Sequence, residues 1–184
     1  MKTTEETLLI HQLMDLKTRR RAFETMVRQY SEKLYWMVRR MVLNHEDAND
    51  IMQNTFLKAW SSIDDFRQDS KLSTWLYRIA VNESIDFMRR AKVRRAVSTD
   101  EAEGSGVAAQ LVADKYFDGD RTQALLMEAT SLLPEVQRMV FNLRYYDEMK
   151  YSDMSQLLDT SEGALKASYH IAVKKIKEYF SRHD

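Results

Sequence analysis

The sequence predicts an all-α protein made of two small helical domains joined by a flexible acidic linker. Only four of its 184 residues are Gly and one is Pro, the two residue types that most often interrupt helices. Apolar residues recur at helical spacing over most of the chain. The exception is residues 96–120, which are acidic, rich in small residues and without that periodicity. These observations predict helical domains at residues 8–95 and 121–184.

The charged residues are unevenly distributed although the net charge is zero. Residues 1–95 hold 18 Lys and Arg against 13 Asp and Glu, residues 96–120 hold 1 against 6, and residues 121–184 hold 9 of each. Such an uneven charge distribution indicates surfaces with different partners, which the net charge of the whole chain does not reveal. The chain lacks Cys, which excludes disulfides and thiolate metal sites. Because neither a secretory signal nor a membrane-spanning apolar run is visible, we expect a cytoplasmic protein without membrane insertion.

The first domain is predicted to contain helices at about residues 8–15, 20–43, 47–62 and 74–95. The third has an apolar stripe through Ile51, Phe56 and Trp60, typical of a face that packs in a core. Its other side carries Asp47, Asp50, Gln53, Asn54 and Lys58. This acidic and amide surface suits a basic protein partner, although an ordinary solvated face has the same pattern. A polar loop follows, and Ser73 is the expected N-cap of the next helix.

Aromatic and basic residues alternate around that loop. Phe66, Trp75 and Tyr77 lie among Arg67, Lys71, Arg78, Asn82 and Arg89. This mixture suits single-stranded DNA, in which bases are free to stack on aromatic rings. Trp75 taken alone is better explained as a core residue beside Trp60, whereas Phe66 lies in a polar loop and is expected to be exposed.

The second domain is predicted to end in a helix-turn-helix. Helices are expected at residues 121–132, from Pro134 to Tyr146, at 151–158 and at 162–180, with a tight turn at 159–161. In a helix-turn-helix, a short helix is followed by a three-residue turn and a longer helix, and the longer helix lies in the major groove of DNA. The last helix presents Gly163, Lys166, Ala167, His170 and Lys174 on one face. A plain helical hairpin with a solvated basic face satisfies the same spacing.

No constellation of residues predicts an enzyme. Asp64 and Asp65 are paired carboxylates, but the sequence gives them no partner His and no Gly-rich loop. The four His residues show no metal-ligand spacing. We therefore expect no catalytic residue, no metal and no cofactor.

The two informative blocks resemble regions of a known protein family. Region 2 of the bacterial sigma-70-type factors is similar to DANDIMQNTFLKAW, STWLYRIAVN and FMRR, and region 4 to the block LLPEVQRMVFNLRYYDEMKYSDMSQLLDTSEGALKASYHIAVKKI. Only these two regions are present, which is the layout of the extracytoplasmic-function (ECF) subfamily. The resemblance implies a factor that binds RNA polymerase core, recognises the −10 and −35 promoter elements and promotes DNA melting.

The resemblance also implies roles for individual residues. The polymerase-binding set, directed at the clamp helices of the largest subunit, is Asp47, Asp50, Gln53 and Asn54. The −10 and melting set is Phe66, Arg67, Lys71, Ser73, Trp75, Arg78, Asn82, Asp86, Arg89 and Arg90, with the loop at 66–73 capturing a flipped base. The −35 set is Ser161, Gly163, Lys166, Ala167, His170 and Lys174. Further implied partners are the polymerase flap, held by residues 134–146, and an anti-sigma protein.

The chain departs from the family pattern in two places. Ser168, Ile171 and Val173 stand where many members carry Arg, which implies a weaker phosphate grip or a different −35 sequence. The usual turn glycine is Asp159, a residue type that tolerates the left-handed conformation. Two alternatives remain from the residues alone. A stand-alone helix-turn-helix regulator leaves residues 47–95 unexplained, and a helical adaptor that binds only protein leaves the basic faces unexplained.

Overall fold

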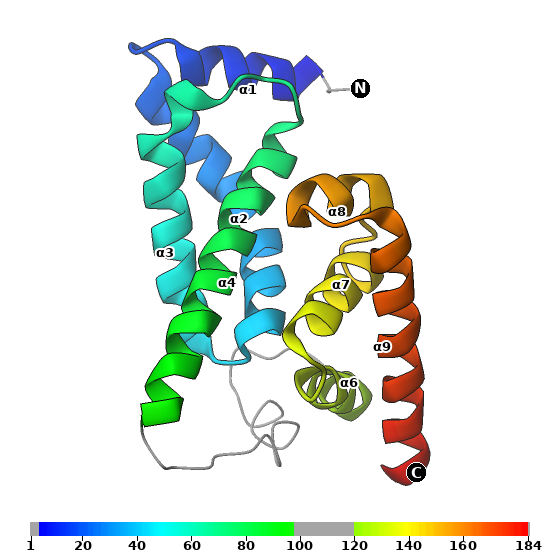
Figure 1. Ribbon diagram of the computed structural model, residues 1–184. Helices are drawn as coiled ribbons and strands as arrows, with labels where there is room; N and C mark the ends of the chain where they lie inside the picture. Colours follow the sequence, from blue (N-terminus) through cyan, green and yellow to red (C-terminus); the bar gives the residue numbers. More distant parts are fainter. Residues whose placement is uncertain (1–3, 98–119, 184) are drawn as a thin grey trace. The chain divides into compact units, whose positions relative to one another are not determined.

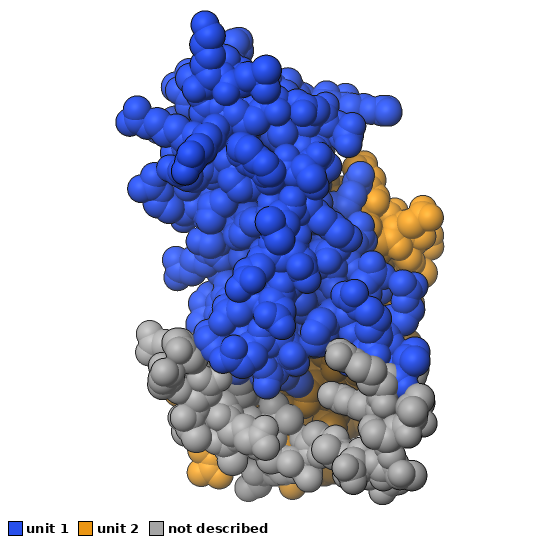
Figure 2. Space-filling model, turned by 90° about the vertical axis from the view of Figure 1, so that its left-hand side faces the viewer, with its two compact units in different colours: residues 1–98 blue, residues 99–184 orange. Residues whose placement is uncertain are grey.

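The computed structural model describes residues 4–97 and 120–183, and all regular secondary structure in those ranges is helical (Figure 1). The all-α prediction is therefore confirmed for the described part of the chain. The chain divides into two compact units, residues 1–98 and 99–184 (Figure 2). Residues 98–119, which hold most of the predicted linker, lie outside the described residues, so the linker stays a prediction.

Unit 1 is built from four α-helices and one short 3-10 helix. They are α1 (Thr4–Met14), α2 (Arg19–Val42), α3 (His45–Ser61), η1 (Ile63–Asp65) and α4 (Leu72–Val97). Figure 1 shows α2, α3 and α4 side by side, with α1 lying across one end of them. Each of the three long helices contributes side chains that are fully buried, among them Met37, Ile51 and Leu76. Burial of such apolar side chains is the main force holding the bundle together.

The turn between α2 and α3 is shorter than predicted. Leu43 adopts a left-handed conformation with φ 63°, and the side chain of Asn44 accepts a hydrogen bond of 3.1 Å from the backbone N–H of Asp47. This N-cap satisfies one of the free donors of the first turn. Helix α3 can therefore begin at His45, two residues before the predicted start.

The predicted N-cap at Ser73 is wrong. Helix α4 begins at Leu72, so Ser73 lies in its first turn. The backbone N–H of Leu72 instead donates to Oε1 of Glu6, at 2.8 Å, and Glu6 belongs to α1. The cap thus comes from a helix far away in the sequence, which local capping rules do not consider.

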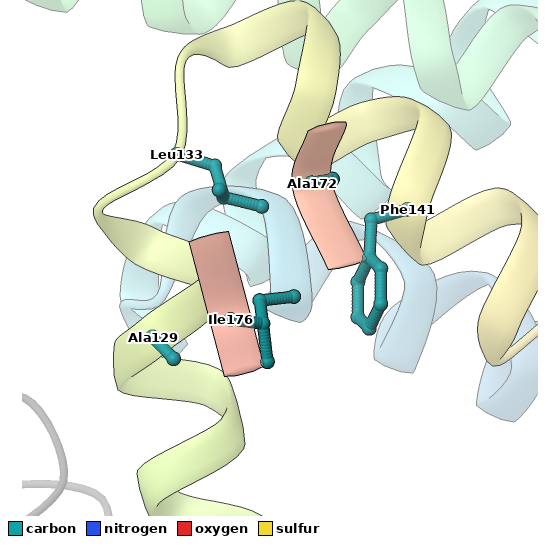
Figure 3. Close-up of a cluster of buried hydrophobic side chains, with 5 residues drawn as sticks. All are labelled: Ala129, Leu133, Phe141, Ala172 and Ile176. Carbon is teal, nitrogen blue, oxygen red and sulfur yellow. The ribbon is translucent and has the colours of Figure 1, made fainter. Parts of the chain in front are cut away.

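The described part of unit 2 contains α6 (Arg121–Ser131), α7 (Glu135–Tyr145), α8 (Tyr151–Leu158) and α9 (Glu162–His183). Pro134 occupies the N-cap position of α7, in accord with its predicted place at a helix start. Helix α9 contacts each of the other three helices described in this unit. Figure 3 shows part of its core, a cluster of Ala129, Leu133, Phe141, Ala172 and Ile176. This packing fixes which face of α9 points outward.

Candidate nucleic-acid interface

The turn between α8 and α9 is held by its own polar residues. Asp159 is left-handed, with φ 48° and ψ 47°, which confirms that Asp can serve at this position. Its N–H donates to the carbonyl of Ser155 and closes α8. The hydroxyl of Ser161 accepts a 3.3 Å hydrogen bond from the N–H of Ala164, the pattern of an N-cap for α9. The predicted helix-turn-helix is therefore present.

One face of α9 is open to solvent. Leu165, Ala172 and Ile176 are buried against the rest of unit 2. The opposite, exposed face carries the predicted set, namely Gly163, Lys166, Ala167, His170 and Lys174. A side chain at Gly163 would meet no atom within 4 Å, so the fold itself does not require glycine there. The N-terminal end of this face therefore carries no large side chain at Gly163, which would allow a DNA backbone to approach closely.

The cations of this face are only weakly engaged. Lys166 Nζ lies 3.4 Å from Oε2 of Glu162 and 5.5 Å from the centre of the Tyr151 ring. Lys174 Nζ lies 4.0 Å from Oε1 of Glu178. Exposed ion pairs of this kind contribute about 0–1 kcal/mol, so both lysines can exchange these partners for phosphates.

Behind this face an aromatic cluster fixes α9 on α7. The ring of Tyr169 stacks on that of Phe141, with 5.9 Å between centroids and 15° between planes. Burial raises the pKa of the Tyr169 phenol, and the neighbouring Tyr151 raises it further. Tyr169 therefore stays uncharged at neutral pH and serves as a packing residue beneath the exposed surface.

Helix α3 carries the second candidate surface. Its inner face is buried through Ile51, Met52 and Thr55. Asp50, Gln53 and Asn54 are exposed, and Asp47 is half-buried. The structure adds Leu57, whose residue is 67% exposed, at helical spacing from Asp50 and Gln53. Sequence reasoning missed Leu57, although its position seven residues after Asp50 could have indicated it.

The loop before α4 differs from the prediction in one important respect. Phe66 is only 5% exposed, and its ring centroid lies 5.1 Å from that of Trp75. The expectation that Phe66 is exposed is therefore wrong, because the half-buried Trp75 provides an apolar surface that covers it. The expectation that Trp60 is a core residue beside Trp75 is also wrong: Trp60 is 43% exposed, and its ring meets that of Phe23 edge-on with 5.0 Å between centroids, whereas Trp75 packs against Phe66. Arg67 and Lys71, in contrast, are exposed as expected.

Helix α4 continues the basic surface beyond this loop. Arg78, Asn82, Arg89 and Arg90 are exposed, and the half-buried Asp86 accepts a 2.9 Å hydrogen bond from Nη2 of Arg89. Arg78, Asn82, Asp86 and Arg89 follow helical spacing and share one face. Side chains at 92 and 94–97 lie outside the described part of the chain. The exposed loop residues and this helix face are the candidate sites in unit 1 for contact with opened DNA.

In the described residues, whose regular structure is all helical, one acidic-amide face and two basic faces are the surfaces expected of the class of DNA-binding proteins that also dock on a protein partner. Comparisons with known proteins then specify the family. The Sigma-70 region 2 family model matches residues 26–94, and the Sigma-70 region 4 model matches residues 123–176. This chain belongs to the ECF subfamily of the sigma-70 family of RNA polymerase sigma factors.

Relatives cover most of the chain. ECF RNA polymerase sigma factor SigW of Bacillus subtilis is 35% identical over 156 residues, which span 81% of this chain and 83% of that protein. The ECF RNA polymerase sigma-E factor of Escherichia coli is 32% identical over 155 residues, 80% of each chain. The match therefore extends across both units.

Solved structures agree on the fold. The sigma factor RpoE of Bartonella quintana, in complex with the anti-sigma factor NepR, matches with a TM-score of 0.70 and 21% identity, over 86% of this chain and 96% of that one. CnrH, in complex with the cytosolic domain of CnrY, matches with a TM-score of 0.71 and 22% identity, over 97% and 99%. Within the described ranges, no helix combines the length and apolar character needed to cross a membrane.

Proposed function

We propose that this chain binds RNA polymerase core in the cytoplasm, recognises the −10 and −35 elements of particular promoters and promotes their melting, without covalent chemistry of its own. The observation that carries the proposal is the pairing, in one ECF-family chain, of the exposed Asp50–Gln53–Asn54 face with the exposed helix-turn-helix face of α9. The first surface suits a basic protein, and the second suits duplex DNA.

The proposed mechanism divides the work between the units. In unit 1, Asp47, Asp50, Gln53 and Asn54 contact the clamp helices of the largest polymerase subunit. In unit 2, α9 lies in the major groove at −35, where phosphate contacts position the protein and base contacts specify the sequence. Residues 134–146 hold the polymerase flap. The loop before α4 and the exposed face of α4 engage the −10 element as it opens.

An anti-sigma protein is part of the same proposal. Bartonella quintana RpoE, which shares the fold, was solved with an anti-sigma factor bound. We propose a protein of that kind as the partner that restrains this chain. Its identity is to be found by capture with the full chain and tested by whether it blocks core binding.

The function is tested by transcription with purified components. Core polymerase alone should fail to initiate specifically on genomic DNA, whereas core with this chain should start at a limited set of sites. Mapping those starts should reveal a shared pair of sequences near −10 and −35. A chain that binds no core, but binds duplex DNA tightly alone as a dimer, would instead be a stand-alone regulator.

Replacing Asp50 and Gln53 by Ala should weaken core binding without unfolding the protein. Both side chains are exposed, and the opposite face of α3 supplies the core contacts. We expect the free energy of unfolding to change by less than about 1 kcal/mol, while the Kd for core rises, as measured by fluorescence anisotropy titration.

A matched control for this test lies on α2. Gln29 and Glu32 are also exposed, with the same three-residue spacing and likewise one amide and one carboxylate. Replacing both by Ala should leave the Kd for core unchanged. Equal Kd values for the two double variants would refute the docking assignment.

Replacing Lys166 by Ala should weaken −35 binding on most sequences, because an exposed cation on the groove face would be lost. The slope of log K against log salt should fall by about one unit. His170→Ala should instead alter which −35 bases are preferred. Lys33→Ala, which removes an exposed cation from α2, serves as the charge control. If Lys166→Ala left the salt slope unchanged and His170→Ala left the base preference unchanged, another face of α9 would be the one that contacts DNA.

A further inference from the structure

The segment that joins α3 to α4 is held at both ends by residues from outside the α3–α4 pair. At its start, Arg19 binds Asp64 with two hydrogen bonds, Nη2 to Oδ1 at 2.5 Å and Nη1 to Oδ2 at 3.1 Å. The Nε of Arg19 also donates to the carbonyl of Leu13, at the end of α1, at 2.9 Å. A two-pronged guanidinium–carboxylate pair fixes orientation as well as distance.

At the end of the segment, Glu6 of α1 supplies the cap of α4. Its Oε1 accepts the hydrogen bond of 2.8 Å from the N–H of Leu72, one of the first-turn donors that have no partner within the helix. A carboxylate at a helix N-terminus is also favoured by the helix dipole. The Glu6 side chain therefore fixes where α4 begins and where the preceding loop ends.

Between these two anchors lies the exposed part of the loop. Ile63 and Phe66 are buried at one side and Leu72 at the other. Arg67 and Lys71 are exposed, and Gln68 has a positive φ of 62°. Helix α1 buries its own apolar face through Leu9, Ile10 and Leu13 and contacts η1. Helix α1 is thus a packed support, and its Glu6 reaches the end of the loop.

We infer that Glu6 and Arg19 are positioning residues for promoter opening, which hold the loop at 66–71 in the shape that receives an opened base. The inference rests on the proposed function, because it assigns a purpose to that loop. Both residues precede residue 26, where the match to the Sigma-70 region 2 model begins. The support for the loop therefore comes from a part of the chain outside the matched region.

The direct test is Glu6→Ala compared with Glu5→Ala. Glu5 is the exposed neighbour in α1, so both variants remove one carboxylate from the same turn. Opening is followed by the fluorescence of 2-aminopurine placed in the −10 element of a promoter found with the wild-type chain. Glu6→Ala should slow opening about five- to tenfold, and Glu5→Ala should not. Glu6→Gln, which keeps an acceptor oxygen, should recover much of the rate.

Two further readouts separate positioning from a general loss of structure. Amide hydrogen exchange in the 66–72 region should become faster in Glu6→Ala, while the Kd for core should stay at the wild-type value. A template with a pre-melted −10 region should restore activity, because the opening cost is already met. Loss of a negative charge alone would strengthen DNA binding, so slower opening has the opposite sign to a simple charge effect.

The other anchor gives an independent test at an exposed side chain. The side chain of Asp64 is 71% exposed, and Asp65 beside it is also exposed. Asp64→Asn should slow opening and Asp65→Asn should not. The positioning role would be overturned if Glu6→Ala opened the promoter as fast as Glu5→Ala, and Asp64→Asn as fast as Asp65→Asn, while the wild-type chain opened it normally. A wild-type chain that opens no promoter with core would refute the proposed function itself.

Discussion

Replacing Lys58 by Ala should destabilise unit 1 by about 2–3 kcal/mol, although Lys58 is a largely exposed residue. Its Nζ pairs with the Oε1 carboxylate oxygen of Glu83, which joins α3 to α4. The side chain of Lys58 is 60% exposed, whereas that of Glu83 is only 6% exposed. Removing the lysine would leave a buried carboxylate without its counter-charge, and such a group is costly to keep in a protein interior.

The measurement is helped by the placement of the tryptophans. Trp36, Trp60 and Trp75 are the three in the chain, and all lie in unit 1. Tryptophan fluorescence during urea unfolding therefore reports on that unit. Lys33→Ala removes an exposed lysine from α2 and should change the free energy of unfolding by less than about 0.5 kcal/mol.

The partner variant should behave differently. Glu83→Leu removes the buried charge together with the need to compensate it, and Lys58 can turn to solvent. Replacing a buried charge by an apolar residue of similar size is often neutral or stabilising. If Lys58→Ala proved as harmless as Lys33→Ala, the pair would not contribute to stability.

The parts of the fold that the sequence predicts are those set by local patterns. The short helix expected at residues 151–158 is observed as Tyr151–Leu158, because Asp159 ends it in a left-handed turn. The outward faces of α3 and α9 follow from their apolar stripes, since a helix that buries one side must expose the other. Exposure of Asp50, Gln53, Lys166 and His170 was predictable for this reason.

The parts that the sequence does not predict depend on contacts between distant residues. The Lys58–Glu83, Arg19–Asp64 and Glu6–Leu72 bonds join residues separated by 25, 45 and 66 positions. Each charged side chain looks locally like an ordinary solvated one. Phe66 shows the same limitation, because its burial depends on Trp75, which lies on the next helix. The polar sequence of the loop does not indicate that Trp75 packs against Phe66.

The burial of Phe66 also changes what the loop is expected to do during melting. Flipping a base out of the duplex costs a few kcal/mol of free energy. Stacking of that base on an aromatic ring would recover roughly the same amount. Phe66 is buried against Trp75, with the two rings tilted by 41°, and so anchors the loop rather than offering an exposed ring. We therefore assign stabilisation of the opened strand to the exposed Arg67 and Lys71.

The double variant Arg67→Ala with Lys71→Ala should impair promoter opening far more than closed-complex formation. Two cations beside the opened strand would be lost, and the opening equilibrium should fall on the order of tenfold. Arg28→Ala with Lys33→Ala removes the same two residue types from exposed positions on α2 and serves as the charge control. Transcription is measured on a normal duplex and on a template pre-melted at −10.

The two templates decide between opening and other roles. With the pre-melted template, the loop variant should regain most of its activity, because the free energy of opening no longer has to be supplied by the protein. The α2 control should behave like the wild-type chain on both templates. Equal loss by the loop variant on both would mean that Arg67 and Lys71 act at another step, such as binding the duplex before it opens.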